Sequence, residues 1–212
     1  LQSFIACRNF INSIPSELSL LPQLEFLYLA DNRLTSIPSG LCNSKSIVEI
    51  DLSDNQIQTL PDNMYLMESL EVLNLKKNGI MTFPITITKI PNLKHLELFN
   101  NQLTTLPIEI GNLKKIEFLL LDDNMIECIP PEFAGMVSLK YLFISNNMIK
   151  TFPTCLTKLS KLTQLHLEQN KISRLPSDIG HLDKLQVLNL NNNNLIELPK
   201  EIGNLYNLKS LS

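Results

Sequence analysis

Apolar residues return along this chain with a period of 23 residues, without an insertion or deletion. The fifth unit, residues 93–115, reads LKHLELFNNQLTTLPIEIGNLKK. Its positions 1, 4, 6, 11, 14, 18 and 21 are Leu or Ile, position 9 is Asn and position 15 is Pro. Nine such units fill residues 1–207, and residues 208–212 begin a tenth. Self-similarity at a fixed period of this length indicates a repeat architecture in which each unit packs on its neighbours.

The spacing within a unit predicts one short strand followed by a return segment. Positions 3 to 5 are predicted as a strand, with positions 4 and 6 in the core and positions 3 and 5 on the outer face of the sheet. Successive strands would stack in parallel about 4.8 Å apart. Positions 11, 14, 18 and 21 are predicted to be buried by the return segment, which Pro at position 15 starts in extended geometry because its ring fixes φ. The Asn side chain at position 9 both donates and accepts, so we expect it to satisfy backbone groups of its own turn and of the neighbouring one.

These features predict one domain over residues 1–212, an α/β repeat solenoid with nine full units and a partial tenth. Its parallel β-sheet would line the concave side, and short irregular or helical segments the convex side. Ser44 replaces a core Leu at position 21, so we expect the second unit to be slightly loosened, and Gly79 at position 10 is a second departure. The chain starts at position 1 of a unit without a Met and stops at position 5 of another. We therefore expect a part of a longer array or of a multidomain protein.

Composition narrows the class of protein. The chain is 44% hydrophobic, which excludes full disorder, and no apolar run has the roughly 18 residues of a membrane span. A net charge of −3 disfavours binding to nucleic acid. The four cysteines show no pairing or metal-ligand spacing, and none of the Asn residues lies in an N-x-Ser/Thr acceptor. Both facts favour a cytoplasmic location, with recruitment to the inner membrane through partners as a variant.

No constellation of residues indicates catalysis. The three histidines fall at different unit positions: His95 and His166 on the predicted concave face, His181 on the convex side. Asp122 and Asp123 precede a predicted turn, where we expect them to face a partner or solvent rather than to form an acid–base pair. The sequence therefore predicts neither an enzyme, nor a cofactor, nor a metal site, and function must come from a binding surface.

Positions 3 and 5 are free of the core constraint, so their identity carries information about binding. In the sixth and seventh units these positions are all apolar, and Phe99 at position 7 of the fifth unit should border them. Contiguous exposed apolar patches mark interaction sites more often than not. The alternative is contact with a missing flanking segment or with a crystal or oligomer neighbour. The predicted partner-binding residues here are Phe99, Phe118, Leu120, Tyr141 and Phe143, flanked by His95 and His166 and bordered by Asp122 and Asp123.

A second feature of the predicted concave face is its charge. Positions 2, 3, 5, 7 and 8 hold eleven acidic and six basic residues, a net of about −5. The second and third units contribute five acids and no base, next to a smaller aromatic pair. Such a surface would steer a partner with a basic patch, although its charges would equally well keep the sheet soluble. The candidate residues here are Phe26, Tyr28, Glu49, Asp51 and Asp54.

The form LxxLxLxxNxLxxLPxxIxxLxx resembles the leucine-rich repeat, and the resemblance covers the whole chain. The strict 23-residue units with LPxxIxxL are similar to the intracellular class found in Ras suppressor, Ras–Raf scaffold proteins, Scribble, Erbin and plant Ras-group proteins. This resemblance implies a leucine-rich repeat horseshoe that scaffolds signalling complexes, with a small GTPase or a phosphatase as partner. The shared residues build the scaffold, so the resemblance assigns no binding residue.

Two functions follow from this interpretation. The first is an intracellular protein-interaction module that scaffolds or adapts a signalling complex through its concave face. The second is the recognition or regulatory region of a larger enzyme or receptor, such as a kinase, phosphatase or adenylate cyclase. The chain itself is non-catalytic in both.

Overall fold

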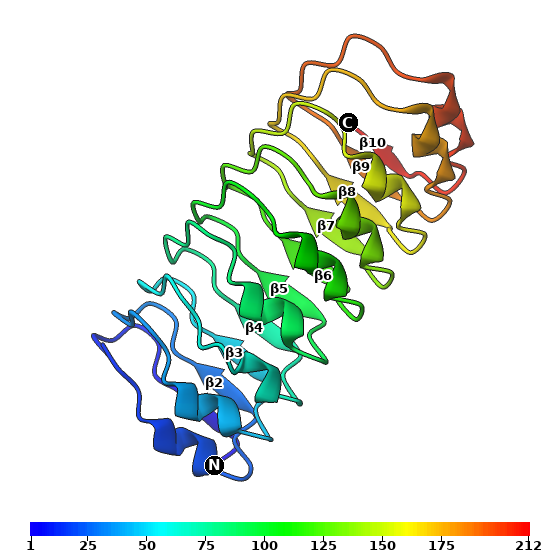
Figure 1. Cartoon of the computed structure of the whole chain (residues 1–212). Coiled ribbons are helices and arrows are strands. Elements are labelled where there is room, and N and C mark those ends of the chain that lie inside the picture. The colour runs from blue at the N-terminus through cyan, green and yellow to red at the C-terminus, as the bar shows by residue number, and fades with distance from the viewer.

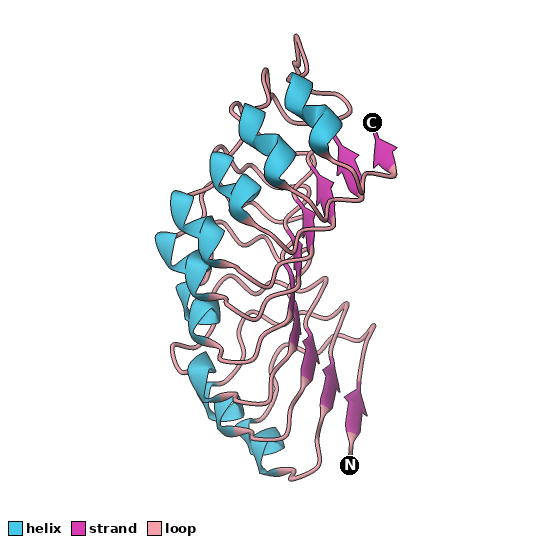
Figure 2. Cartoon of the chain, turned by 90° about the vertical axis from the view of Figure 1, so that its right-hand side faces the viewer, coloured by secondary structure: helices cyan, strands magenta, loops and turns pink.

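The computed structural model describes all residues 1–212 and shows an open, curved solenoid (Figure 1). Ten parallel strands form one sheet in chain order, and nine short 3₁₀ helices lie on the opposite side. Figure 2 shows the strands along the inner arc and the helices along the outer arc, with the termini at opposite ends. The predicted horseshoe, with its parallel concave sheet, is confirmed.

All ten strands are very short. They are β1 Ser3–Ile5, β2 Phe26–Tyr28, β3 Glu49–Asp51, β4 Val72–Asn74, β5 His95–Glu97, β6 Phe118–Leu120, β7 Tyr141–Phe143, β8 Gln164–His166, β9 Val187–Asn189 and β10 Ser210–Leu211. The first nine coincide with positions 3 to 5, as predicted. Each strand pairs with the same positions of the next unit, so Leu119 of β6 lies opposite Leu142 of β7. From β2 to β9 the middle residue is buried and its two neighbours are half-buried, which confirms the predicted alternation.

The return segments are 3₁₀ helices that follow the repeated proline. They are η1 Ser16–Leu20, η2 Ser39–Asn43, η3 Met64–Leu66, η4 Ile85–Lys89, η5 Ile108–Asn112, η6 Pro131–Gly135, η7 Thr154–Lys158, η8 Ser177–His181 and η9 Lys200–Asn204. Pro107 is extended (φ −73°, ψ 156°) and leads directly into η5, as its fixed φ predicts. Ile110 and Leu113 of the same unit are fully or almost fully buried. None of these helices has the length and apolar character needed to cross a bilayer.

The asparagines at position 9 form the predicted ladder between units. The Nδ2 of Asn124 donates to the carbonyl oxygens of Leu121 in its own unit and Leu98 in the preceding one, both at 3.0 Å. Its Oδ1 accepts the backbone N–H of Leu103 in the preceding unit, also at 3.0 Å. One buried side chain thus satisfies backbone groups on both sides of a unit boundary, which helps each unit to fix the register of its neighbour.

The conformation of position 8 was missed by the sequence analysis. This residue has a left-handed backbone in every full unit, with φ between 49° and 57°. Asn and Asp tolerate that region better than other non-glycine residues, and they occupy six of the nine positions, which is the signal that could have predicted the turn. The nine residues are Arg8, Asp31, Asp54, Lys77, Asn100, Asp123, Asn146, Gln169 and Asn192.

The two departures from the repeat are accommodated locally. Gly79 adopts φ 73°, and in this unit the backbone N–H of Asn78 donates to the Oδ1 of Asn101 at 3.0 Å. Ser44 is 1% exposed, and its hydroxyl lies 3.4 Å from that of Ser46. The polar substitution is therefore buried with a partner, and the expected loosening of the second unit stays a prediction.

Candidate protein-binding face

The concave sheet brings the predicted aromatic residues into one continuous stack. The Phe118 and Tyr141 rings are nearly parallel, at 8°, with centroids 4.3 Å apart. His95 stacks on the side of Phe118 that faces away from Tyr141, with the two ring centroids 5.2 Å apart and the ring planes inclined by 14°. These residues are at position 3 of β5, β6 and β7, where the parallel register places them side by side.

Position 5 carries a second stack one strand further along the sheet, on β6 to β8. The Phe143 and His166 rings lie 4.4 Å apart at 10°, and Leu120 is the register partner of Phe143 on the other side. We call the two stacks together the aromatic cluster. Its members are His95, Phe118, Leu120, Tyr141, Phe143 and His166.

The aromatic cluster is half-buried, whereas the sequence suggested an exposed patch. Half-burial is shared by positions 3 and 5 of every strand from β2 to β9, because the neighbouring strands cover them, and within the cluster the stacked rings also cover one another's faces and leave mainly their edges accessible. A ring edge carries partial positive charge and still presents carbon, so the cluster offers a rigid apolar ridge rather than a set of open ring faces.

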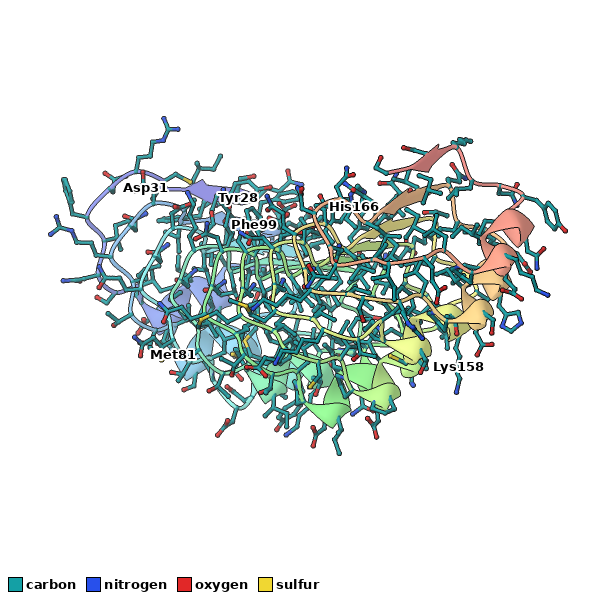
Figure 3. The ribbon with its side chains drawn as sticks, turned by 90° about the horizontal axis from the view of Figure 1, so that it is seen from above. Tyr28, Asp31, Met81, Phe99, Lys158 and His166 are labelled. Atoms are coloured by element: carbon teal, nitrogen blue, oxygen red, sulfur yellow. The ribbon has the colours of Figure 1, made fainter.

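Phe99 does not join the ring stacks. The ammonium of Lys76 lies 4.9 Å from the Phe99 ring centroid, in cation–π geometry. Both residues are at position 7, one unit apart, so the contact runs along the margin of the sheet. Figure 3 shows Phe99, Tyr28 and His166 on the sheet side of the molecule and Lys158 on the helix side.

Carboxylates lie next to the two histidines of the aromatic cluster and next to a lysine at its margin. His95 Nε2 lies 2.9 Å from Glu97 Oε1, and His166 Nδ1 lies 3.7 Å from Glu168 Oε2. On the opposite margin of the sheet, at position 2, Lys140 pairs with Glu117 at 2.6 Å. The cluster therefore has a polar rim, which is the arrangement of protein-interaction hot spots.

Asp122 and Asp123 are adjacent in sequence but differ in surroundings. Asp122 is half-buried, and its Oδ1 accepts the backbone N–H of Ser145 at 2.7 Å. Burial raises the pKa of Asp122, and the charge of Glu168 adds to this effect. Asp123 is exposed and accepts from Asn146 Nδ2 at 2.6 Å. The two adjacent carboxylates therefore accept hydrogen bonds from different residues.

The bond to Ser145 explains why Asp122 is half-buried. In the third unit, where position 5 is Asp51, that residue accepts the N–H of Ser53 at position 7 of the same turn. In the seventh unit position 5 is Phe143, which has no acceptor, and Asp122 of the preceding unit takes over this task. The sequence analysis noted Asp122 and missed its partner, because the contact crosses a unit boundary.

Of the predicted acidic residues, Glu49 and Asp51 lie on β3 and Asp54 lies in the turn that follows it; β3 pairs with β2, which carries the aromatic pair. The Phe26 and Tyr28 rings are tilted by 33° at 6.3 Å, so they do not stack. Burial and the neighbouring Glu49 carboxylate raise the pKa of Tyr28. Asp54 pairs with Lys77 of the fourth unit at 3.2 Å. The sequence count gave the second and third units five acidic residues and no base. In the structure one of the five, Asp54, is paired with a lysine of the next unit.

The rest of the chain shows no arrangement for metal or thiol chemistry. No group of three or more His, Cys, Asp or Glu side chains could hold a metal ion. All four cysteines are free. Burial raises the pKa of Cys42 and of Cys155 to about 11, so both are inert thiols of the core at neutral pH. What the geometry offers is a binding surface.

Comparison with known families identifies the repeat. Two models described as leucine rich repeat match residues 22–80 and 130–172, and residues 92–113 and 184–205, which together are more than half of the chain. The chain belongs to the leucine-rich repeat family, whose domains are generally protein–protein interaction modules. No curated protein matches the chain.

Solved structures with the same fold include plant receptors and bacterial internalins. An internalin from Listeria monocytogenes is 24% identical, with a TM-score of 0.81, over 95% of this chain and 58% of that one. The ectodomain of the Arabidopsis thaliana membrane receptor kinase GASSHO1/SCHENGEN3, in complex with CASPARIAN STRIP INTEGRITY FACTOR 2, is 27% identical with a TM-score of 0.74. It is matched over 93% of this chain and 27% of that one. The plant peptide hormone receptor RGFR1, in complex with RGF2, is 27% identical with a TM-score of 0.77, over 100% and 39%. The chain thus spans less than two thirds of each of these proteins.

Proposed function

We propose that this chain binds a protein or peptide partner on its concave sheet, over β5 to β8. The observation that carries the proposal is the aromatic cluster. Four adjacent strands place six apolar or ring side chains in two ordered stacks, with carboxylates at the rim. Pre-organised side chains lose little conformational entropy when a partner docks, which favours binding.

We further propose that the binding serves an intracellular signalling scaffold, with a small GTPase or a phosphatase as partner. The strict 23-residue unit and its resemblance to the Ras-suppressor and Scribble class support this choice. Cytoplasmic location is part of the same proposal and stays a prediction from the sequence.

A second candidate function is the recognition region of a larger receptor or enzyme. It is favoured by the two plant receptors above, which are similar over nearly the whole of this chain and are described in complex with their ligands. In this case the partner would be a peptide, and the signalling activity would lie in a part of the protein outside residues 1–212.

The test is capture of partners from a cell lysate by the chain and by its Phe118→Ser, Tyr141→Ser, Phe143→Ser triple variant. A matched control carries Ile108→Ser and Tyr206→Ser, which remove apolar side chains that are 60% and 85% exposed and lie away from the sheet. Circular dichroism verifies that all three proteins fold. The proposal expects partners that the control retains and the triple variant loses.

Loading the lysate with GDP or with a GTP analogue separates the finer alternatives. A captured protein whose retention depends on the nucleotide supports a small GTPase. Identical captures by the chain and the folded triple variant would overturn the proposed face.

A further inference from the structure

A row of lysines lies along one flank of the solenoid, outside the concave sheet. Each 3₁₀ helix ends at position 20 of its unit, and positions 21 to 23 lead back toward the next strand. These return turns follow one another along the same side of the molecule (Figure 1), and Figure 2 looks onto that side. From the fourth to the eighth unit, positions 20 to 23 hold six lysines, which we call the lysine flank: Lys89, Lys114, Lys115, Lys158, Lys161 and Lys184.

The lysine flank is positively charged in a chain that is acidic as a whole. Asp183 is the only acidic residue at these positions, so six lysines leave the flank a net charge of +5, against −3 for the whole chain. All six lysines are exposed. None of them takes part in an ion pair, whereas Lys77, Lys94 and Lys140 are each paired with a carboxylate. Their charges are therefore free to attract an anion from outside the chain.

Three of these lysines line a small cavity between the fourth and fifth units. Its volume is about 200 Å³, and its wall contains Lys89, Lys114 and Lys115 but no acidic side chain. The ammonium of Lys115 donates to Asn92 Oδ1, and that of Lys114 donates to the carbonyl oxygen of Gly135 at 3.1 Å. Both acceptors are neutral. A phosphate that enters the cavity would therefore form ion pairs with ammonium groups that have none in the free chain.

Exposed apolar side chains lie among the lysines. Val137 is 55% exposed and holds, in the sixth unit, the position that Lys114 holds in the fifth. Pro91 is exposed at the same position of the fourth unit. A surface that combines cations with exposed apolar side chains suits the headgroup layer of a membrane, because charge attraction and the burial of apolar groups both contribute to binding there.

We infer that the lysine flank binds the surface of a lipid bilayer that contains anionic lipids. A lysine held near such a surface strengthens binding about fivefold, and six of them on one side act together. The curve of the solenoid lies in the plane of Figure 2, so the flank meets a flat surface without bending away from it as the convex side does. The inference uses no residue of the concave face and is independent of the proposed function.

Two other anionic partners, nucleic acids and carboxylate-rich peptides, fit less well. Arginine is the favoured cation for both, because its planar fork bonds to a phosphate, a base edge or a carboxylate through two parallel hydrogen bonds. The lysine flank holds no arginine. Lysines are point charges that attract many headgroups without a fixed geometry, which suits a fluid anionic surface.

The test is co-sedimentation of the chain with unilamellar vesicles of phosphatidylcholine, either alone or with about one third of phosphatidylserine. We expect binding to the vesicles that contain phosphatidylserine and none to phosphatidylcholine alone. Binding should disappear in about 1 M salt, where the screening length falls to about 3 Å. Duplex DNA and polyglutamate, added at the same concentration of charge, should not displace the chain from the vesicles.

Two variants with the same net charge locate the contact. The flank variant replaces three of the six lysines and should bind phosphatidylserine vesicles about a hundredfold more weakly. Its substitutions are Lys89→Gln, Lys158→Gln and Lys184→Gln. The control replaces three lysines that are also exposed and without an ion pair but lie outside the flank: Lys150→Gln, Lys171→Gln and Lys200→Gln. The control should bind like the native chain, and circular dichroism verifies that both variants fold.

Five results would overturn the inference: no binding to phosphatidylserine vesicles, equal binding to phosphatidylcholine alone, binding that persists in high salt, displacement by DNA or polyglutamate, and equal loss in the two variants. Loss of vesicle binding in the Phe118→Ser, Tyr141→Ser, Phe143→Ser variant would move the lipid contact to the concave face and would overturn it too. None of these results decides the proposed function, because capture of a protein partner is measured separately with its own variants.

Discussion

Strands β2 to β4 and strands β5 to β8 belong to one sheet with the same register and the same alternation of buried and half-buried residues, yet their outer side chains make different contacts. Over β5 to β8 the rings stack at 4.3 to 5.2 Å. Over β2 and β3 the two rings are tilted at 6.3 Å, among carboxylates that serve as acceptors for backbone and side-chain groups. The comparison teaches that the repeat fixes the backbone and leaves the outer positions free to build an ordered apolar surface or a diffuse charged one.

The two regions are joined at the boundary between the fourth and fifth units, and breaking that boundary should have the largest effect. Asn101 accepts the backbone N–H groups of Asn78 and Ile80 and donates to the carbonyl oxygens of Leu75 and Leu98. We predict that Asn101→Ala lowers the free energy of unfolding by about 3 kcal/mol or more, since several buried backbone groups lose their partner. Denaturant unfolding measures this effect.

In a solenoid, stability is carried by interfaces between neighbours, so the same variant should separate the unfolding of the two regions into two steps. The control is Gln102→Ala, which truncates the exposed side chain next in sequence. An Asn101→Ala protein as stable as this control would contradict the role assigned to the ladder.

Next in size is the difference between the two aromatic groups in partner binding. Tyr141 stacks on Phe118 within the aromatic cluster, whereas Tyr28 lies in the acidic region. We predict that Tyr141→Ala weakens binding of the captured partner by about 2 kcal/mol, roughly thirtyfold, and Tyr28→Ala by less than about threefold. Titration calorimetry gives both values, and equal losses would remove the distinction between the regions.

The acidic region should act on the rate of association more than on affinity. The triple variant Glu25→Gln, Glu49→Gln, Asp51→Asn removes the charge of Glu25, which directly precedes β2, and of two residues of β3, and it keeps acceptor atoms. We predict up to about tenfold slower association at low ionic strength and an unchanged dissociation rate, because exposed charges steer encounter. The difference should fade as salt approaches physiological strength, where the screening length is about 8 Å. Stopped-flow mixing would show a salt-independent rate if steering were absent.

A smaller effect is predicted for Asp122, whose pKa is raised by burial and by the charge of Glu168. The folded protein keeps this proton at pH values where the unfolded chain, with a pKa of about 3.9, has lost it. Stability therefore falls as the pH rises through the window between the unfolded and the raised folded value, and the cost remains above it. Asp122→Asn should be slightly more stable than the native chain at neutral pH, with no difference below the window. Thermal melting across pH checks this; a variant less stable at neutral pH would contradict it.

The smallest difference that we expect is in how tightly the core is packed in the second unit and in the seventh unit. Cys42 in the second unit and Cys155 in the seventh are both buried, with a pKa of about 11, while Cys128 is exposed. Iodoacetamide should label Cys128 before Cys42 and Cys155, which it should reach only on unfolding. The ratio of their labelling rates, read by mass spectrometry, measures the loosening expected from Ser44. Labelling of either as fast as Cys128 would contradict the shared core.

The sequence was sufficient for the repeat register and its strands, and insufficient for the left-handed turn at position 8 and for the site. Leu96 and Leu119 could be placed in the core because a strict period leaves one register, and the strands follow from it. The stacking of Phe118 on Tyr141 and the pairing of Phe99 with Lys76 depend on rotamers, which periodicity does not determine. The bond from Ser145 to Asp122 crosses a unit boundary, so a pattern read within one unit cannot find it.

The central claim is that the aromatic cluster, and not the convex side, contacts the partner. The most direct measurement places a photo-crosslinking residue at Gln164, which lies opposite Tyr141 in the register, and in a second protein at Tyr206, which is 85% exposed. The account predicts a crosslinked partner from Gln164, its loss in the Phe118→Ser, Tyr141→Ser, Phe143→Ser background, and none from Tyr206. A crosslink from Tyr206 alone, or one from Gln164 that survives the triple substitution, would contradict it.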